Sequence, residues 1–274
     1  LKDLRKITAK RKNFLKNLDF SNANIMGIVN LTPDSFSDGG KYNSKNKSID
    51  HIKKLITSGA NIIDLGGEST RPGAKTLSVQ NEWRRLKNSL ISFKKNNKSI
   101  LLSLDTRKPE IMEKSLKYGV DIINDVSGFE FNEFSPKMIK KIKVAKVLHH
   151  MQGTPKNMQK NPKYNNVLLD IYDFFENKLK KIRYMGIKHN NIILDPGIGF
   201  GKNLKHNITL LNNISIFHSL GFPIMLGISR KKFIKDLSGN NDSKERLGGT
   251  ISSSLYAMTQ GVQILRIHDV NEVN

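Results

Sequence analysis

The sequence has 274 residues, of which 37% are hydrophobic, and it contains no cysteine. This composition excludes disulfides, thiolate nucleophiles and cysteine-ligated zinc, and no stretch approaches the roughly 18 consecutive apolar residues of a membrane span. The formal net charge of +22 would suit a nucleic-acid partner, but the lysines are spread along the whole chain among many Asn and Ile residues, which favours a general compositional drift.

The first 20 residues alternate Lys or Arg with single apolar residues. They lack the apolar stretch of about 7 to 15 residues that a secretory signal needs. We therefore expect a cytoplasmic protein in which a basic extension, residues 1–23, packs on a single domain formed by residues 24–274.

Short apolar runs without polar alternation follow along the chain. Such runs are typical of strands buried on both faces, as in parallel sheets. The eight runs are residues 24–29, 61–66, 100–105, 120–124, 144–149, 191–195, 222–227 and 262–268. Segments with a helical repeat lie between them, most clearly residues 48–59, 109–119 and 167–186. Eight strand-then-helix units predict an α/β fold, the (β/α)8 or TIM barrel. An open doubly wound sheet is the alternative, although it would normally have fewer units.

Polar residues stand at or just after the end of every run. In a (β/α)8 barrel these strand ends surround one mouth, where reactive groups converge. The residues are Asn30; Glu68, Thr70 and Arg71; Asp105; Asn124; His149 and His150; Asp195; Ser229 to Lys231; and Arg266 with His268. Any one of them alone would be interpreted as a turn former, a helix cap or a structural histidine. Their position on one rim instead predicts a binding site.

The rim lacks the common nucleophile and phosphate-loop motifs. The glycine-rich stretch 195–203 has Pro196 directly after its strand, which argues against a dinucleotide fingerprint. Asp105, Asn124 and Asp195 suit the N–H donors of a planar heterocycle, because a carboxylate accepts two parallel N–H bonds.

The cationic residues of the rim suit an anion; they are Lys231, Arg266 and His268. Asn30 offers a neutral oxygen ligand for Mg²⁺, which often takes only one or two protein ligands and completes its shell with water and phosphate oxygens. The residues together predict a pocket for a flat nitrogen heterocycle with a phosphate group nearby.

Eight segments of the chain resemble motifs of the dihydropteroate synthase family of pterin-binding enzymes, in the family's order. They are NLTPDSFSDGG (30–40), DLGGESTRPGA (64–74), LDTRKPE (104–110), INDVSG (123–128), HMQGTPKNMQ (150–159), LDPGIGFGKN (194–203), GISRKKFI (227–234) and RIHDV (266–270). The resemblance implies a (β/α)8 fold and a transferase that condenses 6-hydroxymethyl-7,8-dihydropterin diphosphate with 4-aminobenzoate. The products would be 7,8-dihydropteroate and pyrophosphate, and Mg²⁺ would be required.

The resemblance also implies roles for the matching residues. Asp105, Lys231, Arg266 and His268 would be catalytic. The pterin pocket would be formed by Asp105, Asn124, Asp195 and Lys231 and lined by Val126 and Phe200. Asn30 would bind the metal, Arg266 and His268 would hold the pyrophosphate, and Ile267 between them would also contact substrate. Thr70, Arg71 and Pro72 would face the 4-aminobenzoate, while residues 32–40 would fold over the leaving group.

The sequence departs from the family pattern at three places. His149 replaces a methionine that packs on the pterin, and an imidazole can still stack there. Lys232 replaces a serine near the 4-aminobenzoate carboxylate, which a second cation would attract. The chain ends at Asn274, where the family continues into a last barrel helix at the dimer interface. We therefore expect either a fragment or a lost helix, and a homodimer only if that interface is kept.

Two other functions compete with this prediction. Related pterin-binding barrels transfer a methyl group from methyltetrahydrofolate to a corrinoid, but they are not expected to combine TPDSFSDGG, STRPGA and SRK. A basic barrel that binds nucleic acid without catalysis rests on the net charge alone. We expect small-molecule substrates, no membrane association and no specific nucleic-acid partner.

Overall fold

The computed structural model describes residues 15, 18–32, 43–70, 73–97, 99–188, 191–239, 242 and 244–274, without the side chains of residues 43–46 and 94–96. Its strands coincide with the eight predicted runs. In chain order they are β1 (Asn24–Asn30), β2 (Ile62–Gly66), β3 (Leu101–Asp105), β4 (Ile122–Asp125), β5 (Ala145–His149), β6 (Ile192–Asp195), β7 (Met225–Gly227) and β8 (Ile264–Ile267).

The strand β7 is shorter than the run that predicts it. Pro223 has no N–H to donate to a ladder, and Ile224 forms only an isolated parallel bridge with Leu194 of β6. The Leu194 amide donates to the Pro223 carbonyl (2.8 Å), so this end of β7 still touches β6.

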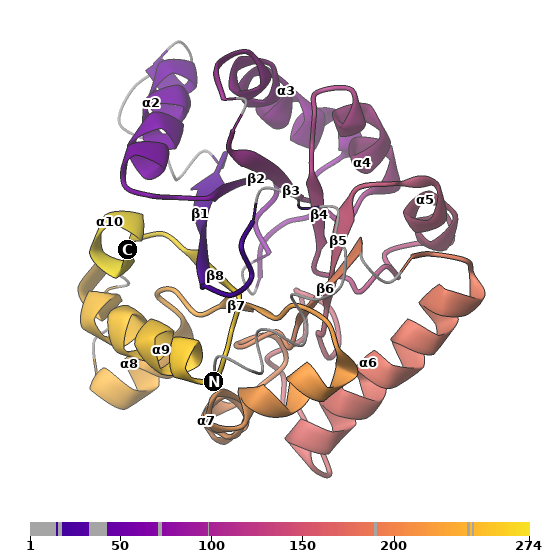
Figure 1. The fold of residues 1–274 in the computed structure, drawn as a ribbon, viewed down its shortest axis with the longest axis vertical. Helices are drawn as coiled ribbons and strands as arrows, with labels where there is room; N and C mark the ends of the chain where they lie inside the picture. Colours follow the sequence, from indigo (N-terminus) through magenta and orange to yellow (C-terminus); the bar gives the residue numbers. More distant parts are fainter. Residues whose placement is uncertain are drawn as a thin grey trace.

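All neighbouring strands of the sheet are parallel, in the order β6-β5-β4-β3-β2-β1-β8-β7. The bridge between Leu194 and Ile224 brings the two outer strands, β6 and β7, together. The sheet is therefore a nearly closed barrel, and Figure 1 shows its strands in the middle of the molecule with helices around them. This confirms the predicted (β/α)8 fold over the doubly wound alternative.

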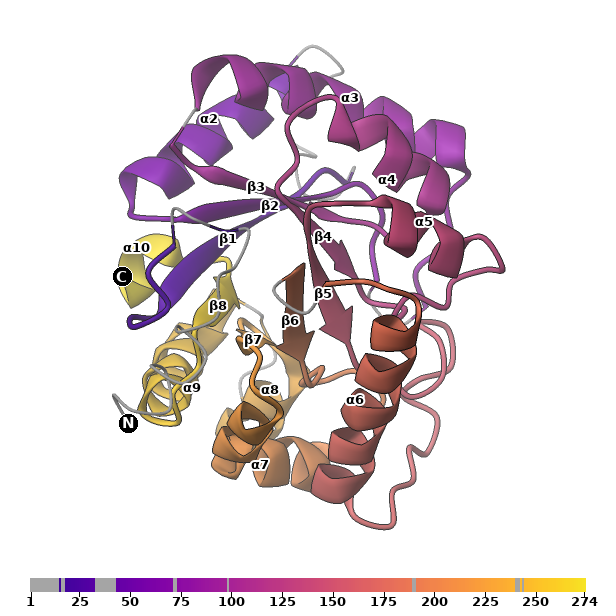
Figure 2. The ribbon, with the colours of Figure 1, turned by 45° about the vertical axis from the view of Figure 1, so that its right-hand side comes forward.

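Helices and short 3₁₀ segments form the outer layer. They are α2 (Asn43–Thr57), α3 (Val79–Asn96), α4 (Pro109–Leu116), α5 (Ser135–Lys141), α6 (Val167–Tyr184), α7 (Leu204–Asn212), η3 (Ile214–Leu220), α8 (Lys232–Ser238), η4 (Lys244–Arg246), α9 (Leu247–Thr259) and α10 (Val270–Val273). Figure 2 shows α2 and α3 above β1 to β3 and α6 to α9 at the opposite side. The three most clearly predicted helices correspond to α2, α4 and α6.

Alternation along the strands separates two apolar cores. One core lies between the barrel and its helices and contains, for example, Leu65, Leu104 and Leu148. The other fills the barrel interior with the alternate residues, such as Met26 and Ile122. Because successive side chains in a strand point to opposite faces, each strand contributes to both cores.

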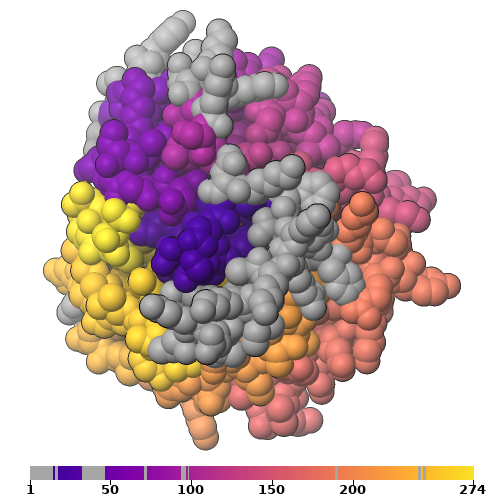
Figure 3. Space-filling model, viewed as in Figure 1, coloured from indigo at the N-terminus to yellow at the C-terminus, as the bar shows by residue number. Residues whose placement is uncertain are grey.

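The described part of the N-terminal segment packs against the interior core. Leu15 and Phe20 are buried there, and Leu18 packs beside them. Figure 3 shows indigo residues near the start of the described chain at the centre of one face, with purple residues above them and yellow residues of the C-terminal part to the left. The boundary predicted at residue 23 stays a prediction. Among the described residues, no helix is both long and apolar enough to cross a membrane.

Candidate active site

Four strand ends place their residues in one row across the barrel. The registers pair Asn30 with Gly66, Gly66 with Asp105, and Asp105 with Asn124. The three polar residues of the row were predicted as site residues. Because Gly66 has no side chain, it leaves an open place between Asn30 and Asp105: a Cβ on Gly66 would lie 3.6 Å from Asp105 Oδ2 and 3.7 Å from Asn30 Oδ1.

Arg266 of β8 connects two of the carboxylates that face the barrel interior. Its Nε donates to Asp64 Oδ2 (2.6 Å) and its Nη2 donates to Asp105 Oδ2 (2.7 Å). Asn124 Nδ2 donates to the same Asp64 oxygen (3.2 Å). Asp64 therefore holds two predicted site residues, although the sequence analysis did not single it out. The available signal was an acid within an apolar run, two positions before Gly66 and so on the same face of the strand.

The pKa values in this cluster follow from burial and charge. Burial raises the pKa of Asp105 to about 7; Arg266 opposes this shift, while the neighbouring Asp64 adds to it. Burial disfavours the charged form of Arg266, but Asp64 and Asp105 outweigh burial and raise the Arg266 pKa above its usual value. Arg266 is thus a permanent cation, and the charge of Asp105 depends on what lies beside it.

Asp195 lies at the end of β6, beside His149 at the end of β5. The Gly197 amide donates to Asp195 Oδ1 (2.8 Å), and His149 Nε2 lies 3.9 Å from Asp195 Oδ2. Burial raises the pKa of Asp195, against the effect of Lys231. Burial also lowers the pKa of His149 well below its usual value, so His149 is a neutral imidazole in this place.

Three more predicted residues lie near Asp195 or its neighbour His149. The Phe200 ring lies edge-on to His149, with 4.5 Å between the ring centroids, and the ammonium of Lys231 lies 4.5 Å from the centre of the Phe200 ring. The Val126 carbonyl lies 3.2 Å from His149 Nδ1. The structure thus brings Val126, Phe200, Asp195 and Lys231 to one side of the barrel mouth.

Lys231 is fixed by the loop that follows β6. Its Nζ donates to the carbonyl of Ile198. Burial lowers the pKa of Lys231 to about 8, although Asp195 acts in the opposite direction. Lys231 therefore changes charge within an experimentally accessible range of pH.

Lys202 is a second buried lysine in this region, and in the sequence it stands out only as part of a glycine-rich stretch. It is 3% exposed, and its Nζ donates to the carbonyls of Gly197 and Phe200 (both 2.9 Å) and lies 3.0 Å from His150 Nδ1. Lys202 thus bonds to two carbonyls of the loop after β6 and holds the loop in its shape. No motif signals this role, because it depends on backbone carbonyls that only the folded loop brings together.

His268 lies beyond the end of β8, next to the loop after β7. Its amide donates to Ser229 Oγ (3.1 Å), and its Nδ1 lies 3.0 Å from the same oxygen. Lys232, one of the departures from the family pattern, begins α8 and is exposed.

Four further predicted residues have different outcomes. Thr70 is half-buried after β2, whereas Arg71 and Pro72 lie outside the described residues. Ile267 is fully buried in the core between the barrel and its helices. Its side chain therefore points away from the rim cluster, which leaves only its backbone to reach a ligand. Residues 33–40 of the predicted first loop also lie outside the described part of the chain.

The residues around Asn30 fit a magnesium ion with few protein ligands. Asn30 is half-buried at the end of β1, and its Oδ1 faces the open place at Gly66 that Asp105 also borders. Among the described residues there is no group of three or more His, Cys, Asp or Glu that could hold a metal. The donor set thus suits Mg²⁺ bound by one or two protein oxygens together with a phosphorylated substrate.

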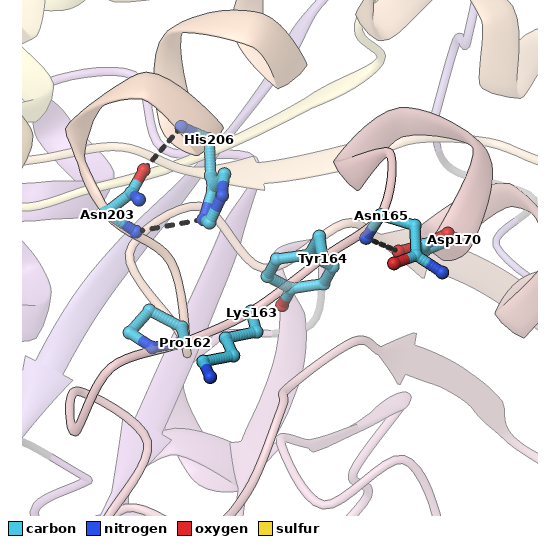
Figure 4. Close-up of a pocket in the computed structure, with 7 residues that line it drawn as sticks. All are labelled: Pro162, Lys163, Tyr164, Asn165, Asp170, Asn203 and His206. Atoms are coloured by element: carbon cyan, nitrogen blue, oxygen red, sulfur yellow. Dashed lines mark hydrogen bonds between the residues drawn. The ribbon is translucent and has the colours of Figure 1, made fainter.

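A separate cavity of about 490 Å³ lies beside the segment before α6 and the start of α7. Figure 4 shows its lining, including Lys163, Tyr164, Asp170 and His206. Tyr164 donates to the Gly201 carbonyl (2.8 Å), so this cavity adjoins the outside of the loop after β6. None of the predicted site residues lines it.

The geometry combines two kinds of group at one mouth. Asp64, Asp105, Asn124 and Asp195 supply oxygen acceptors on buried strand ends, and Asn124 Oδ1 has no hydrogen-bond partner among the described residues. Arg266 and Lys231 supply positive charges beside these acceptors. Such an arrangement can bind a flat heterocycle rich in N–H groups and stabilise opposite charges as they separate.

Comparisons with known proteins agree on one family. A family model described as "Pterin binding enzyme" matches residues 26–268. Dihydropteroate synthase of Escherichia coli strain K12 is 41% identical over 255 residues, which cover 93% of this chain and 89% of that protein. The enzyme of the same name from Synechocystis is 40% identical over 246 residues, covering 90% and 85%.

Solved structures give the same result. The structure of Yersinia pestis dihydropteroate synthase with a sulfonamide drug complex has a TM-score of 0.87 and 38% identity, and the match covers 93% of this chain and 92% of that one. Dihydropteroate synthase from Xanthomonas albilineans in complex with 7,8-dihydropteroate has a TM-score of 0.84 and 31% identity, with coverage of 93% and 91%.

Proposed function

The chain belongs to the pterin-binding enzymes, and among them to the dihydropteroate synthase family, and on this basis we propose that it is a transferase of folate biosynthesis. It condenses 6-hydroxymethyl-7,8-dihydropterin diphosphate with 4-aminobenzoate and releases pyrophosphate and 7,8-dihydropteroate. The observation that carries this proposal is the row of strand ends that contains Asn30, Gly66, Asp105 and Asn124, with Arg266 bonded to Asp105.

In this proposal the pterin ring lies at the mouth between Asp105 and Asn124 on one side and Asp195 on the other. Asp105, Asn124 and Asp195 accept hydrogen bonds from its N–H groups, and Lys231 donates to its acceptor atoms. The unpaired Asn124 Oδ1 supports this orientation, because a buried acceptor is costly unless a donor reaches it. Phe200 and the neutral His149 offer flat, uncharged surfaces beside the ring.

The diphosphate lies toward the strand ends of β1 and β8. Arg266 and His268 bind its oxygens, and Asn30 holds Mg²⁺, which when bound would neutralise part of the diphosphate charge. Because Asp64 and Asp105 orient the Arg266 guanidinium from two sides, this cation is positioned before the substrate arrives. Preorganised charge of this kind lowers the barrier without reorganisation during the reaction.

The chemical step needs stabilisation of charge more than a strong base. Cleavage of the C–O bond leaves positive charge that the dihydropterin shares with its methylene carbon, and the pyrophosphate departs as an anion. Asp105 stabilises the cation while Arg266 and His268 stabilise the anion. The 4-aminobenzoate amine then attacks the methylene carbon, and the new C–N bond is completed when the nitrogen gives one proton to the departing pyrophosphate. Exclusion of water prevents hydrolysis of the cation.

The second substrate is expected on the loop after β2. Thr70, Arg71 and Pro72 face 4-aminobenzoate in this proposal, and Lys232 adds a cation near its carboxylate. Ile267 contributes its backbone only. The homodimer and the cytoplasmic location predicted from the sequence stay predictions.

Methyl transfer from a methyltetrahydrofolate was the alternative for a pterin-binding barrel. The relatives named dihydropteroate synthase at about 40% identity over nearly the whole chain favour the condensation. Release of pyrophosphate separates the two reactions, because methyl transfer produces none.

One assay tests the proposed reaction directly. The protein is supplied with the pterin diphosphate, 4-aminobenzoate and Mg²⁺, and dihydropteroate and pyrophosphate are measured with each component omitted in turn. We expect both products only when all three are present. Asp105→Asn should lose most of the activity while its circular dichroism spectrum stays unchanged. Full turnover by this variant would refute the role of Asp105, and absence of product from the unaltered protein would refute the reaction.

A further inference from the structure

A buried cluster of charged side chains lies at the base of the loop between β2 and α3. It contains Glu68, Glu82, Arg107 and Lys108. The side chains of Glu68, Glu82 and Lys108 are 5%, 0% and 4% exposed. None of these residues belongs to the proposed pterin or diphosphate contacts, so the cluster has a role that the proposed mechanism leaves open.

Glu68 connects the two ends of the loop after β2. Its Oε1 accepts a hydrogen bond from the Leu77 amide (2.7 Å), nine residues further along the chain. Its Oε2 accepts from Arg107 Nε (3.0 Å), and Arg107 Nη2 also donates to Thr76 Oγ1 (3.3 Å). One carboxylate and one guanidinium therefore hold residues 68, 76 and 77 together.

Lys108 holds Glu68 from the other side. Its Nζ donates to Glu68 Oε1 (2.9 Å) and to Glu82 Oε2 (2.5 Å). Glu82, on α3, also accepts from Thr106 Oγ1 (2.6 Å). The cluster thus connects the loop after β2 with helix α3 and with the segment that follows β3 directly after Asp105.

The charge of Glu68 is retained throughout the neutral range. Burial alone would raise the pKa of Glu68, but hydrogen bonds from Lys108 and from the Leu77 amide, together with the nearby cations, lower it overall. Buried ion clusters are often no more stabilising than apolar side chains of the same shape. A cluster of this kind can instead fix the position of the loop, because hydrogen bonds are directional and apolar packing is not.

The segment that Glu68 closes contains Thr70, a described residue that is expected to face 4-aminobenzoate. We propose that Glu68, held by Lys108, is a positioning residue that fixes the loop after β2 for binding of 4-aminobenzoate. This inference rests on the proposed function. It adds that binding of the second substrate, 4-aminobenzoate, depends on a carboxylate that contacts neither substrate.

Glu68→Gln is the first variant that tests the proposal. It removes the charge but keeps the shape, and Lys108 keeps its partner Glu82. We expect the KM for 4-aminobenzoate, at saturating pterin diphosphate, to rise about tenfold, while binding of the pterin diphosphate alone changes less than twofold. Hydrogen exchange at the Leu77 amide should become faster. Glu113→Gln is the matched control, because Glu113 pairs with Lys141 at an exposed site, and it should change none of these quantities.

A second variant covers the case in which Glu68→Gln fails to fold. Arg107→Gln removes the bonds to Glu68 and Thr76 without leaving Glu68 unpaired, and it should give the same selective rise in KM with a smaller amplitude. An unchanged KM for 4-aminobenzoate in the folded variants overturns the proposal, and so does an equal loss of both substrates. If the unaltered protein makes no dihydropteroate, the proposed function fails instead, while faster exchange at Leu77 still shows whether Glu68 holds the loop.

Discussion

Arg266 donates a 2.6 Å hydrogen bond to Asp64, a residue 202 positions earlier in the chain. The bond crosses from β8 to β2, two strands that β1 separates in the sheet, so it spans the interior of the barrel. Because Asp64 also accepts from Asn124, a single fully buried carboxylate orients one residue proposed for the diphosphate and one proposed for the pterin.

Asp64→Asn should therefore reduce activity although Asp64 need not touch a substrate. Hydrogen bonds to charged groups contribute about 1.5–3 kcal/mol, so we expect kcat/KM for the pterin diphosphate to fall roughly 10- to 150-fold. Steady-state kinetics measure the effect. Asp50→Asn, at an exposed site on α2, is the control. A loss below threefold in the Asp64 variant would show that Arg266 keeps its orientation without this carboxylate.

The pH dependence of kcat/KM should reveal Lys231. Below its pKa of about 8 the amine is charged and can donate to the pterin, and above that pH it loses the proton, so kcat/KM for the pterin diphosphate should fall on the alkaline side. In Lys231→Arg the side chain stays charged, and the alkaline decrease should move beyond pH 10 even if the maximum is lower.

Titration of the substrates themselves is the same for both proteins, so the comparison isolates the side chain. Lys137→Arg, at an exposed position, should reproduce the original profile. If kcat/KM decreased at the same alkaline pH in Lys231→Arg and in the unaltered protein, another group would be responsible for the decrease.

Gly197→Ala should disrupt the loop after β6. Gly197 has a φ of +70°, and an added Cβ would lie 1.9 Å from the His150 carbonyl oxygen. Gly186 has a similar φ of +77°, but nothing lies within 4 Å of its Cβ position. We expect Gly186→Ala to cost about 1–2 kcal/mol from backbone strain alone.

Overpacking should add about 1–3 kcal/mol to that strain in Gly197→Ala. Urea denaturation of both variants measures the difference in the free energy of unfolding. Equal losses would mean that the loop moves aside at little cost, and that the His150 carbonyl does not constrain it.

Lys202→Met should weaken both the fold and pterin binding. The change removes the Lys202 bond from the Gly197 carbonyl, which still accepts from the Phe200 amide (3.0 Å), and from the half-buried Phe200 carbonyl. A buried acceptor that loses its donor costs about 1–3 kcal/mol. We expect a lower Tm and a weaker affinity for the pterin diphosphate, both measurable by thermal denaturation with and without the ligand. Lys205→Met, at an exposed position on α7, should leave both unchanged. A normal affinity in Lys202→Met would show that the Gly197 to Phe200 loop holds its shape without this lysine.

Much of the fold is predictable from the sequence because it depends on local patterns. The eight apolar runs became β1 to β8, and the three clearest helical repeats became α2, α4 and α6. Gly59, Gly119 and Gly186, the last residues of these three repeats, all have positive φ values, as is common where a helix ends. Parallel strands then place all their C-terminal ends at one mouth, which explains why position alone predicts Asn30, Asp105, Asn124 and Asp195 there, and the structure has all four at or next to strand ends.

The surroundings of other residues depend on the face of the strand that they occupy or on the loop atoms that they contact, and these are harder to predict from the sequence. Ile267 lies between Arg266 and His268 in the sequence, yet its side chain points into the outer core, since neighbouring residues of a strand face opposite sides. Lys108 follows the predicted residue Asp105 by three positions, and its partners Glu68 and Glu82 come from two other segments.

The amino-acid sequence by itself determined the number of strands, their order along the chain and the polar character of the rim, because these follow from the spacing of apolar and turn residues. Only the tertiary structure decided that Asp64 bonds to Arg266 and that Lys202 bonds to the carbonyls after β6. Such contacts join residues distant in the sequence through the register and closure of the barrel. The free energy of each bond depends on burial and on distances of a few tenths of an ångström, which no local pattern specifies.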